Sequence, residues 1–219
     1  IGNKNTVSKL LNILDKRGLL NNQKFKIRIK KKIPSKAGLG GGSMNAANIL
    51  NYFLKKNIIK INKKEVIKIA KLVGSDVILG LNSTNSILSK NDEVKRFNNC
   101  KKFYSLIVKP SFGCSTKEIY SKVRKFNKPK FNNPNPKMFN LDYLKKMENS
   151  LEPIALSKYS KLREIKSFLE NFSEPSFVRM TGSGSALVAY FQSKYRCEIA
   201  KKMFQKKFKN YWCILSKTI

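Results

Sequence analysis

A cluster of four glycines is the feature of this chain best suited to chemistry. Gly38, Gly40, Gly41 and Gly42 are four of its 11 glycines, and Ser43 follows them directly. Backbone N–H groups that no side chain covers, placed where a helix begins, attract anions and most often phosphates. The Ser43 hydroxyl would be placed to bind a phosphate or a magnesium ion. A flexible turn is the alternative, because a glycine-rich loop alone is a weak signal.

A strand and a helix are expected on either side of this loop. Phe25, Ile27 and Ile29 alternate with basic residues, which predicts a strand with one buried face that ends at Pro34. A helix is expected from about Asn45, where apolar residues follow helical spacing. The loop lacks the Gly-Lys-Ser/Thr ending of a Walker A sequence, so it is not a P-loop of that kind.

The rest of the chain mixes helices and strands, which predicts an α/β or α+β fold. Thr6 is expected to cap the first helix and Gly18 to stop it. The residues from 125 to 137, rich in proline, asparagine and lysine, are expected to form an exposed connector. Further helices are expected at 63–73, 115–123, 141–149, 162–172 and 194–208, and strands at 86–88, 103–109, 177–180, 186–191 and 211–215.

Composition limits the function classes. The 46 Lys and Arg against 13 Asp and Glu give a net charge of +33, but the basic residues are scattered and form no stripe with aromatics. Compositional drift therefore explains the charge better than a nucleic-acid surface does. No apolar run approaches the roughly 20 residues of a membrane span. The four cysteines form no Cys-x-x-Cys pair and histidine is absent, which argues against zinc and favours reduced thiols in the cytoplasm.

Five stretches together resemble one enzyme family. The string from Pro34 to Ala47, with its triple glycine and Asn-Ala-Ala, resembles the phosphate-binding motif of the GHMP kinase superfamily, and four more motifs resemble that superfamily in the same order. The resemblance is greatest to its members that act on a cytidyl-diphosphate substrate. The other four motifs are GSDV at 74–77, KPSFGCSTKEIY at 109–120, NSLEPIA at 149–155 and RMTGSGSA at 179–186.

The resemblance implies both a fold and an activity. The fold would be the α+β GHMP kinase fold, with a ribosomal S5 domain 2-like lobe over residues 1–98, a ferredoxin-like lobe over residues 99–219 and the active site between them. The activity would be the ATP- and Mg2+-dependent phosphorylation of the 2-hydroxyl of 4-diphosphocytidyl-2-C-methyl-D-erythritol, in the non-mevalonate route to isoprenoid precursors. Neither a membrane nor a specific nucleic acid is expected as a partner.

The resemblance also implies roles for individual residues. Asp76 would accept the proton of the substrate hydroxyl or orient that hydroxyl, although an aspartate that only forms a turn after a helix is common. Thr116, Tyr120, Gly182, Ser183 and Gly184 would bind the substrate. The residues expected to bind ATP are Pro34, Gly38, Leu39, Gly40, Gly41, Gly42, Ser43, Asn5 and Lys31, with Ser43 also a candidate metal ligand. For Asn5, Lys31 and Tyr120 the alternatives are a helix start, a solvated lysine and a surface aromatic.

The chain departs from the family pattern in several places. Nothing matches the family's N-terminal strands with their Pro-Ala-Lys-Ile-Asn segment, so an N-terminal portion is expected to be absent, and without that part of the cleft the fragment is expected to be inactive or unstable. Met44 stands where a second serine is usual, Ile78 replaces a proline, Ser150 replaces an aspartate, and residues 89–93 replace a Gly-x-Gly-Glu stretch. Two alternatives stay open: another GHMP kinase, acting on homoserine, mevalonate or a sugar, and a truncated, non-catalytic basic binding protein.

Overall fold

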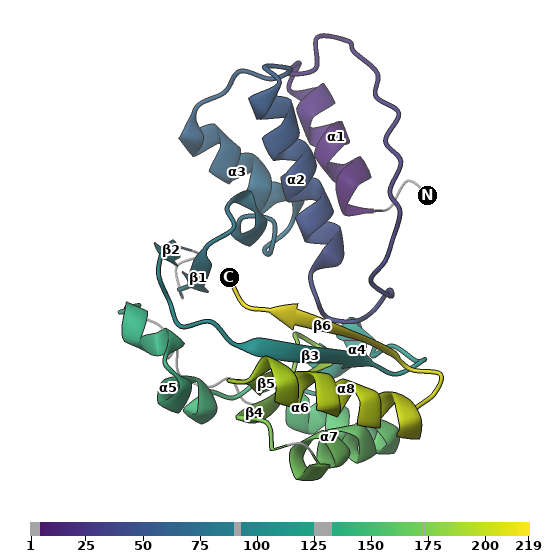
Figure 1. Cartoon of the computed structure of the whole chain (residues 1–219). Helices are drawn as coiled ribbons and strands as arrows, with labels where there is room; N and C mark the ends of the chain where they lie inside the picture. Colours follow the sequence, from purple (N-terminus) through teal and green to yellow (C-terminus); the bar gives the residue numbers. More distant parts are fainter. Residues whose placement is uncertain (1–4, 90–92, 125–132, 173) are drawn as a thin grey trace. The chain divides into compact units, whose positions relative to one another are not determined.

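The computed structural model describes residues 5–89, 93–124, 133–172 and 174–219 (Figure 1). The chain divides into two compact units. Unit 1 comprises residues 1–31 and 40–96, and unit 2 comprises residues 32–39 and 97–219. Helices combine with antiparallel sheets, so the expected α+β class is confirmed.

Unit 1 is a set of three packed helices with a small two-stranded sheet. Its helices α1, α2 and α3 contact one another, and η1 packs on α2. The elements are α1 (Thr6–Lys16), α2 (Gly41–Lys55), α3 (Lys63–Val73), η1 (Leu79–Leu81), β1 (Asn85–Leu88) and β2 (Val94–Phe97), with β1 paired to β2. The apolar positions that follow helical spacing, among them Leu10, Leu14, Leu50 and Ile69, are fully buried and form the core of this unit.

Two of the three expected helix starts in this unit were wrong by position, and only that of α3 at Lys63 was right. Asn5, not Thr6, caps α1, because the Asn5 side-chain oxygen accepts hydrogen bonds from the first free N–H groups. Helix α2 begins at Gly41 and not near Asn45, so the last glycines of the loop form its first turn. Gly40 makes this possible, since its left-handed conformation (φ 63°) turns the chain directly into the helix.

The strand expected around residues 25–29 is also absent. Phe25, Ile27 and Ile29 are half-buried against the core of unit 1, and the basic residues between them are exposed, so the alternation was interpreted correctly. Within the described residues, however, no strand pairs with this segment, and the backbone is extended without a ladder. Alternation indicates a buried face, but a strand also needs a hydrogen-bonded neighbour.

Unit 2 is built on a four-stranded antiparallel sheet in the order β4-β5-β3-β6. Its strands are β3 (Tyr104–Lys109), β4 (Phe177–Met180), β5 (Leu187–Phe191) and β6 (Trp212–Lys217). Its helices are α4 (Thr116–Ser121), η2 (Pro136–Phe139), α5 (Leu141–Lys146), α6 (Glu152–Lys158), α7 (Ser160–Phe172) and α8 (Lys194–Lys207). A strand, helices, two strands, a helix and a strand in this sheet order make the ferredoxin-like arrangement.

The helices α7 and α8 cover one face of this sheet (Figure 1). Leu106 and Val108 of β3 alternate with Ile107 and face these helices, as do Leu187 and Ala189 of β5. The expected strands and helices of this half are confirmed to within a few residues, while α6 was not expected; in unit 1, β2 was not expected either. Residues 125–132 of the expected connector lie outside the described part of the chain, and η2 occupies its end.

Candidate active site

The start of α2 exposes backbone donors. Gly40 provides no side-chain cap, and the first helical hydrogen bond runs from Met44 N to Gly40 O at 2.9 Å. The N–H groups of Gly41, Gly42 and Ser43 therefore have no acceptor within the helix, and they carry the partial positive charge of its N-terminus. A Cβ built on Gly41 would meet no atom within 4 Å, so the space beside this residue is open. These features together suit a bound anion.

Asp76 lies beside that helix start, within unit 1. It sits in the turn that follows α3, where Leu79 N donates to Asp76 O at 3.2 Å. A Cβ built on Gly40 would lie 3.7 Å from Asp76 Oδ2, and one built on Gly74 would lie 3.9 Å from Ser43 Oγ. The Asp76 side chain is exposed and accepts a long hydrogen bond, 3.4 Å, from Ser75 Oγ. The fold therefore brings together the aspartate and the glycine loop, which are far apart in the sequence.

The turn that carries Asp76 is fixed by residues on both sides. Ile78 is buried in the core of unit 1. Arg96 Nη2 donates to Ile78 O at 2.7 Å, and Asn51 Nδ2 of α2 donates to Leu81 O at 3.0 Å. Burial lowers the pKa of Arg96, although a guanidinium remains charged at neutral pH. Sequence reasoning missed Arg96, because nothing in its local sequence indicates a contact 18 residues away.

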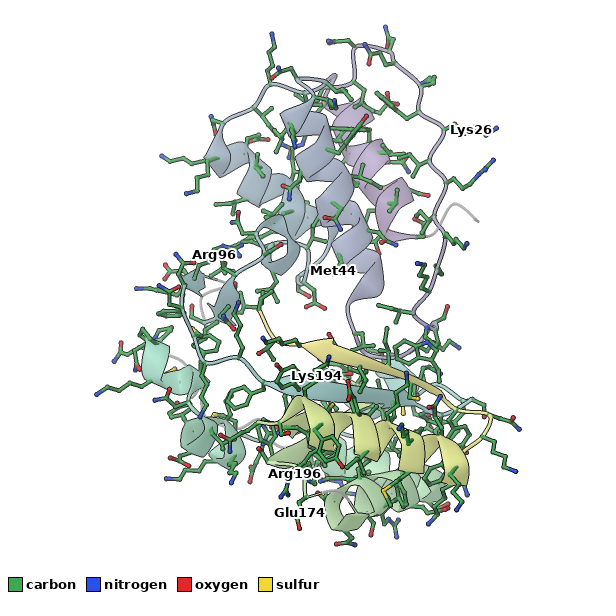
Figure 2. All side chains as sticks on the ribbon, in the orientation of Figure 1. Lys26, Met44, Arg96, Glu174, Lys194 and Arg196 are labelled. Carbon is green, nitrogen blue, oxygen red and sulfur yellow. The ribbon has the colours of Figure 1, made fainter. Side chains whose placement is uncertain are left out.

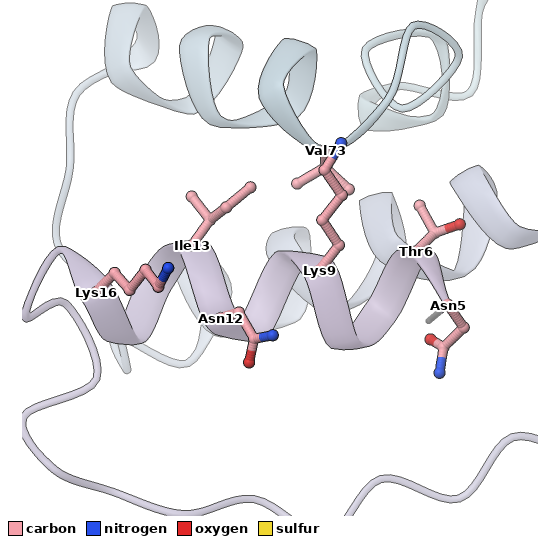
Figure 3. A pocket seen from close by; sticks show the side chains of 7 residues that line it. All are labelled: Asn5, Thr6, Lys9, Asn12, Ile13, Lys16 and Val73. Carbon is pink, nitrogen blue, oxygen red and sulfur yellow. The ribbon is translucent and has the colours of Figure 1, made fainter. Parts of the chain in front are cut away.

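Asn5 lies at one end of a surface hollow of about 500 Å³ (Figure 3). Its Oδ1 accepts from Val7 N at 2.9 Å and Ser8 N at 3.0 Å, and its Nδ2 donates to Ser8 Oγ at 2.9 Å. The structure thus shows Asn5 as the cap of α1, and contact with adenine stays a prediction. Lys31 is exposed. The residues that line the hollow are Asn5, Thr6, Lys9, Asn12, Ile13, Lys16 and Val73.

In unit 2, the first part of the glycine motif packs on the loop at 181–186. Thr181 Oγ1 donates to Ala37 O at 3.0 Å, and Ala186 N donates to the same oxygen at 3.1 Å. A Cβ on Gly38 would lie 2.3 Å from Thr181 O and 3.0 Å from Gly184 O. Gly38 also has a positive φ of 70°. Close backbone packing therefore explains why position 38 is a glycine. It does not explain the glycine at position 41, where the surrounding space is open.

The residues of the NSLEPIA motif support that same loop. Asn149 Nδ2 donates to Met180 O at 2.9 Å and to Gly182 O at 2.7 Å. Glu152 is buried, accepts from Met180 N at 2.6 Å and forms an ion pair with Lys166. Burial disfavours the charge of Lys166, but the hydrogen bond and the attraction of Glu152 raise its pKa overall. The sequence showed this motif but not its role, because the hydrogen bonds of Asn149 and Glu152 reach residues about 30 positions further along the chain.

The expected substrate residues of unit 2 are only partly brought together. Thr116 Oγ1 and Ser183 Oγ lie 2.8 Å apart, so the start of α4 is joined to the 181–186 loop. Tyr120 is 56 % exposed on α4. Pro34 and Leu39 are half-buried in the segment that leads to the helix start. The structure links Thr116 to this loop and shows no comparable contact for Tyr120 among the described residues.

Magnesium binding would depend on few protein ligands. No group of three or more His, Cys, Asp or Glu side chains within the described ranges is arranged to hold a metal. The Asp76 carboxylate and the Ser43 hydroxyl are oxygen donors of the kind that magnesium prefers, and this ion usually takes one or two protein ligands together with phosphates.

In the same described ranges, no helix is long and apolar enough to cross a membrane.

Comparison with known proteins agrees with this geometry. The family described as GHMP kinases N terminal domain matches residues 5–88. A 4-diphosphocytidyl-2-C-methyl-D-erythritol kinase from Pelagibacter ubique (strain HTCC1062) is 55% identical over 98% of this chain and 76% of its own length. A kinase of the same name from Clostridium tetani (strain Massachusetts / E88) is 33% identical over 88% of this chain and 70% of its own length.

Solved structures share the fold. The crystal structure of a 4-(cytidine 5'-diphospho)-2C-methyl-D-erythritol kinase has a TM-score of 0.78 at 21% identity, over 98% of this chain and 78% of that one. A homoserine kinase from Cytophaga hutchinsonii ATCC 33406 has a TM-score of 0.70 at 16% identity, over 99% of this chain and 76% of that one. The fold is thus that of the GHMP kinases, and the sequence relatives show that this chain belongs to the 4-diphosphocytidyl-2-C-methyl-D-erythritol kinase family.

Proposed function

We propose that this protein transfers the γ-phosphate of ATP to the 2-hydroxyl of 4-diphosphocytidyl-2-C-methyl-D-erythritol, a step in isoprenoid precursor synthesis. The names of its relatives support the substrate. The observation that carries the proposal is the Asp76 carboxylate next to Gly40 at the start of α2, because a donor-rich helix start and a carboxylate are what phosphoryl transfer requires.

Different residues of unit 1 would have different roles in phosphoryl transfer. The N–H groups of Gly41, Gly42 and Ser43 would bind phosphate oxygens and offset their negative charge. Asp76 would orient the attacking hydroxyl and accept its proton. Ser43 would also hold Mg2+, which neutralises charge on the phosphates when bound.

The remaining assignments are part of the same proposal. Pro34, Gly38 and Leu39 would shape the approach to the phosphate loop, and Asn5 and Lys31 would contact adenine. The substrate would meet Thr116, Tyr120, Gly182, Ser183 and Gly184. We also propose that residues 1–98 and 99–219 correspond to the two lobes of the family, although residues 32–39 pack in unit 2.

A cytoplasmic site of action fits the cysteines. All four are free thiols, and two of them, Cys114 and Cys197, are buried. Burial raises the pKa of Cys197 to about 11, which keeps this thiol protonated and slow to oxidise. Reduced, unreactive thiols are typical of proteins from reducing compartments.

The test follows ADP release by the full-length protein with Mg-ATP. The acceptors are 4-diphosphocytidyl-2-C-methyl-D-erythritol, homoserine and mevalonate, each in a separate assay. ADP release with the cytidyl substrate alone supports the proposal. Release with another acceptor would keep the fold and change the substrate. A folded protein that releases no ADP, and binds nucleic acid in a salt-sensitive way, would favour a non-catalytic basic binding protein.

A further inference from the structure

The guanidinium of Arg96 contacts three separate points of the chain that follows Asp76. Nη2 donates to Ile78 O at 2.7 Å, and Nη1 donates to Ser86 Oγ at 3.1 Å. Nε donates at 3.1 Å to the side-chain oxygen of Asn82. This bond forms in the orientation of the Asn82 amide in which its nitrogen also donates to Leu81 O. Figure 2 shows Arg96 at the small β1–β2 sheet of unit 1. A planar guanidinium suits such a site, because its donors point in several fixed directions at once.

These contacts reach Asp76 through two residues of backbone. Ile78 is only 5 % exposed, so its side chain anchors the turn in the core while Arg96 fixes its carbonyl. Leu79 N in turn donates to Asp76 O. The Asp76 carboxylate itself is exposed, and its bond from Ser75 is long, at 3.4 Å. Its placement therefore depends on the backbone of the turn more than on contacts of its own.

The turn must hold the Asp76 carboxylate at a precise position if this group is to act on the substrate. Asp76 Oδ2 would lie 3.7 Å from a Cβ on Gly40, so the carboxylate is adjacent to the donors at the start of α2. A displacement of about 1 Å at a reacting group can cost about 100-fold in rate. Loss of the bond to Ile78 O would free a carbonyl only two residues from Asp76.

We propose that Arg96 is a positioning residue that holds the Asp76 turn at the start of α2. The inference rests on the proposed function, because it assumes that Asp76 acts on the substrate. Arg96 touches neither Asp76 nor any glycine of the loop through a contact seen in the described chain. Its effect would therefore fall on turnover and not on the binding of ATP.

The competing explanation is that Arg96 only stabilises unit 1. A stabilising residue would, when removed, loosen β1, β2 and the helices together. A positioning residue would loosen the turn at 76–80 and leave the helices as they were. Hydrogen exchange separates the two, because the amides of Leu79 and Gly80 report on the turn and those of α1 and α2 report on the unit.

The experiment compares Arg96→Met with Lys95→Met in the full-length protein. Lys95 is the exposed neighbour of Arg96 on β2, so its replacement removes the same charge without touching the turn. Arg96→Lys is the second variant, to be used if Arg96→Met does not fold; it keeps the charge but loses the planar set of donors. We measure kcat, the KM for ATP, and amide exchange by NMR or mass spectrometry.

The expected result for Arg96→Met is a fall in kcat of about 10-fold to 100-fold, with the KM for ATP within about twofold of the parent. Exchange should accelerate at Leu79 and Gly80, and stay unchanged in α1 and α2. Lys95→Met should match the parent in all three measurements. An unchanged kcat, or faster exchange throughout unit 1, would overturn the inference.

The outcome stays separable from that of the proposed function. If the parent protein releases no ADP with any acceptor, the proposed function fails, and kcat says nothing about Arg96. The exchange measurement still decides whether Arg96 holds the turn. Faster exchange confined to residues 76–80 would support the positioning role, and exchange that is unchanged or faster throughout would exclude it.

Discussion

Replacement of Gly38 with alanine is expected to destabilise unit 2 by about 2–5 kcal/mol, and the reason is backbone packing. The new Cβ would lie 2.3 Å from Thr181 O and 3.0 Å from Gly184 O, both of which are main-chain atoms. Thr181 is itself fixed, since its N–H donates to Ala186 O at 3.0 Å. Neither oxygen belongs to the end of a flexible side chain that could swing away.

Two costs make up this estimate. A residue other than glycine pays about 1–2 kcal/mol to adopt the left-handed conformation found at Gly38, where φ is 70°. Overpacking in a region that cannot yield costs about 1–3 kcal/mol more. The sum is a large part of the stability of an ordinary domain, so unit 2 of the variant should unfold at clearly lower urea concentration.

The assay uses the single tryptophan of the chain. Trp212 lies on β6, opposite Lys109 of β3, so its fluorescence follows the unfolding of unit 2. Gly41→Ala is the matched control, because a Cβ there meets nothing within 4 Å and the conformation is an ordinary helical one. The control should leave the Trp212 transition in place. A Gly38→Ala protein within about 0.5 kcal/mol of its parent would refute the packing argument.

Three further predictions concern catalysis, binding and pH. Asp76→Asn should lower turnover by about 100-fold to 10,000-fold while calorimetry shows unchanged ATP binding; near-normal turnover would exclude Asp76 from catalysis. Gly41→Val should fold normally, because the site is open, and should weaken ATP binding by more than about tenfold; unchanged affinity would mean that the loop is only a turn. Burial raises the pKa of Tyr190 above 10.0. Burial lowers the pKa of Lys166, but its hydrogen bond and attraction to Glu152, together with Glu170, raise it overall above 10.5, so folding favours the protonated form of each. The contribution of these two groups to the free energy of unfolding should be complete below pH 10 and decline as the pH rises through the raised pKa values. Urea denaturation between about pH 9 and 11 should therefore show a midpoint that falls with pH. A midpoint that does not change with pH would contradict this prediction.

Local sequence predicted what depends on local physics. The strand at Phe177–Met180 and the helix at Lys63–Val73 lie where the pattern of apolar residues placed them, because a buried face imposes its period on the sequence. The segment around Ile27 shows the limit of this reasoning. Its alternation correctly indicated one buried face, but whether a neighbouring strand completes a ladder is decided elsewhere in the chain.

Long-range contacts could not be predicted from the sequence. Arg96 bonds to Ile78 O, and Glu152 bonds to Met180 N, across 18 and 28 residues. No periodicity or cap signal marks either pair, since each bond exists only once the fold has brought the segments together. The predicted start of α2 was wrong for a different reason. The spacing of apolar residues placed the helix start near Asn45, but glycines carry no side chain that could extend this pattern, so it could not show that the helix begins at Gly41.

Two departures from the family pattern are explained by packing in unit 1. Met44, where a second serine is usual, lies on α2 and points toward η1, because a Cβ built on Gly80 would lie 2.8 Å from both Sδ and Cε of Met44. Its side chain therefore packs on the 3-10 turn and cannot replace a hydroxyl ligand. Ile78, where a proline is usual, is buried, and its carbonyl is the acceptor for Arg96. The phosphate loop thus keeps a single hydroxyl at Ser43, and the turn that carries Asp76 gains an apolar anchor in place of the rigid ring of proline.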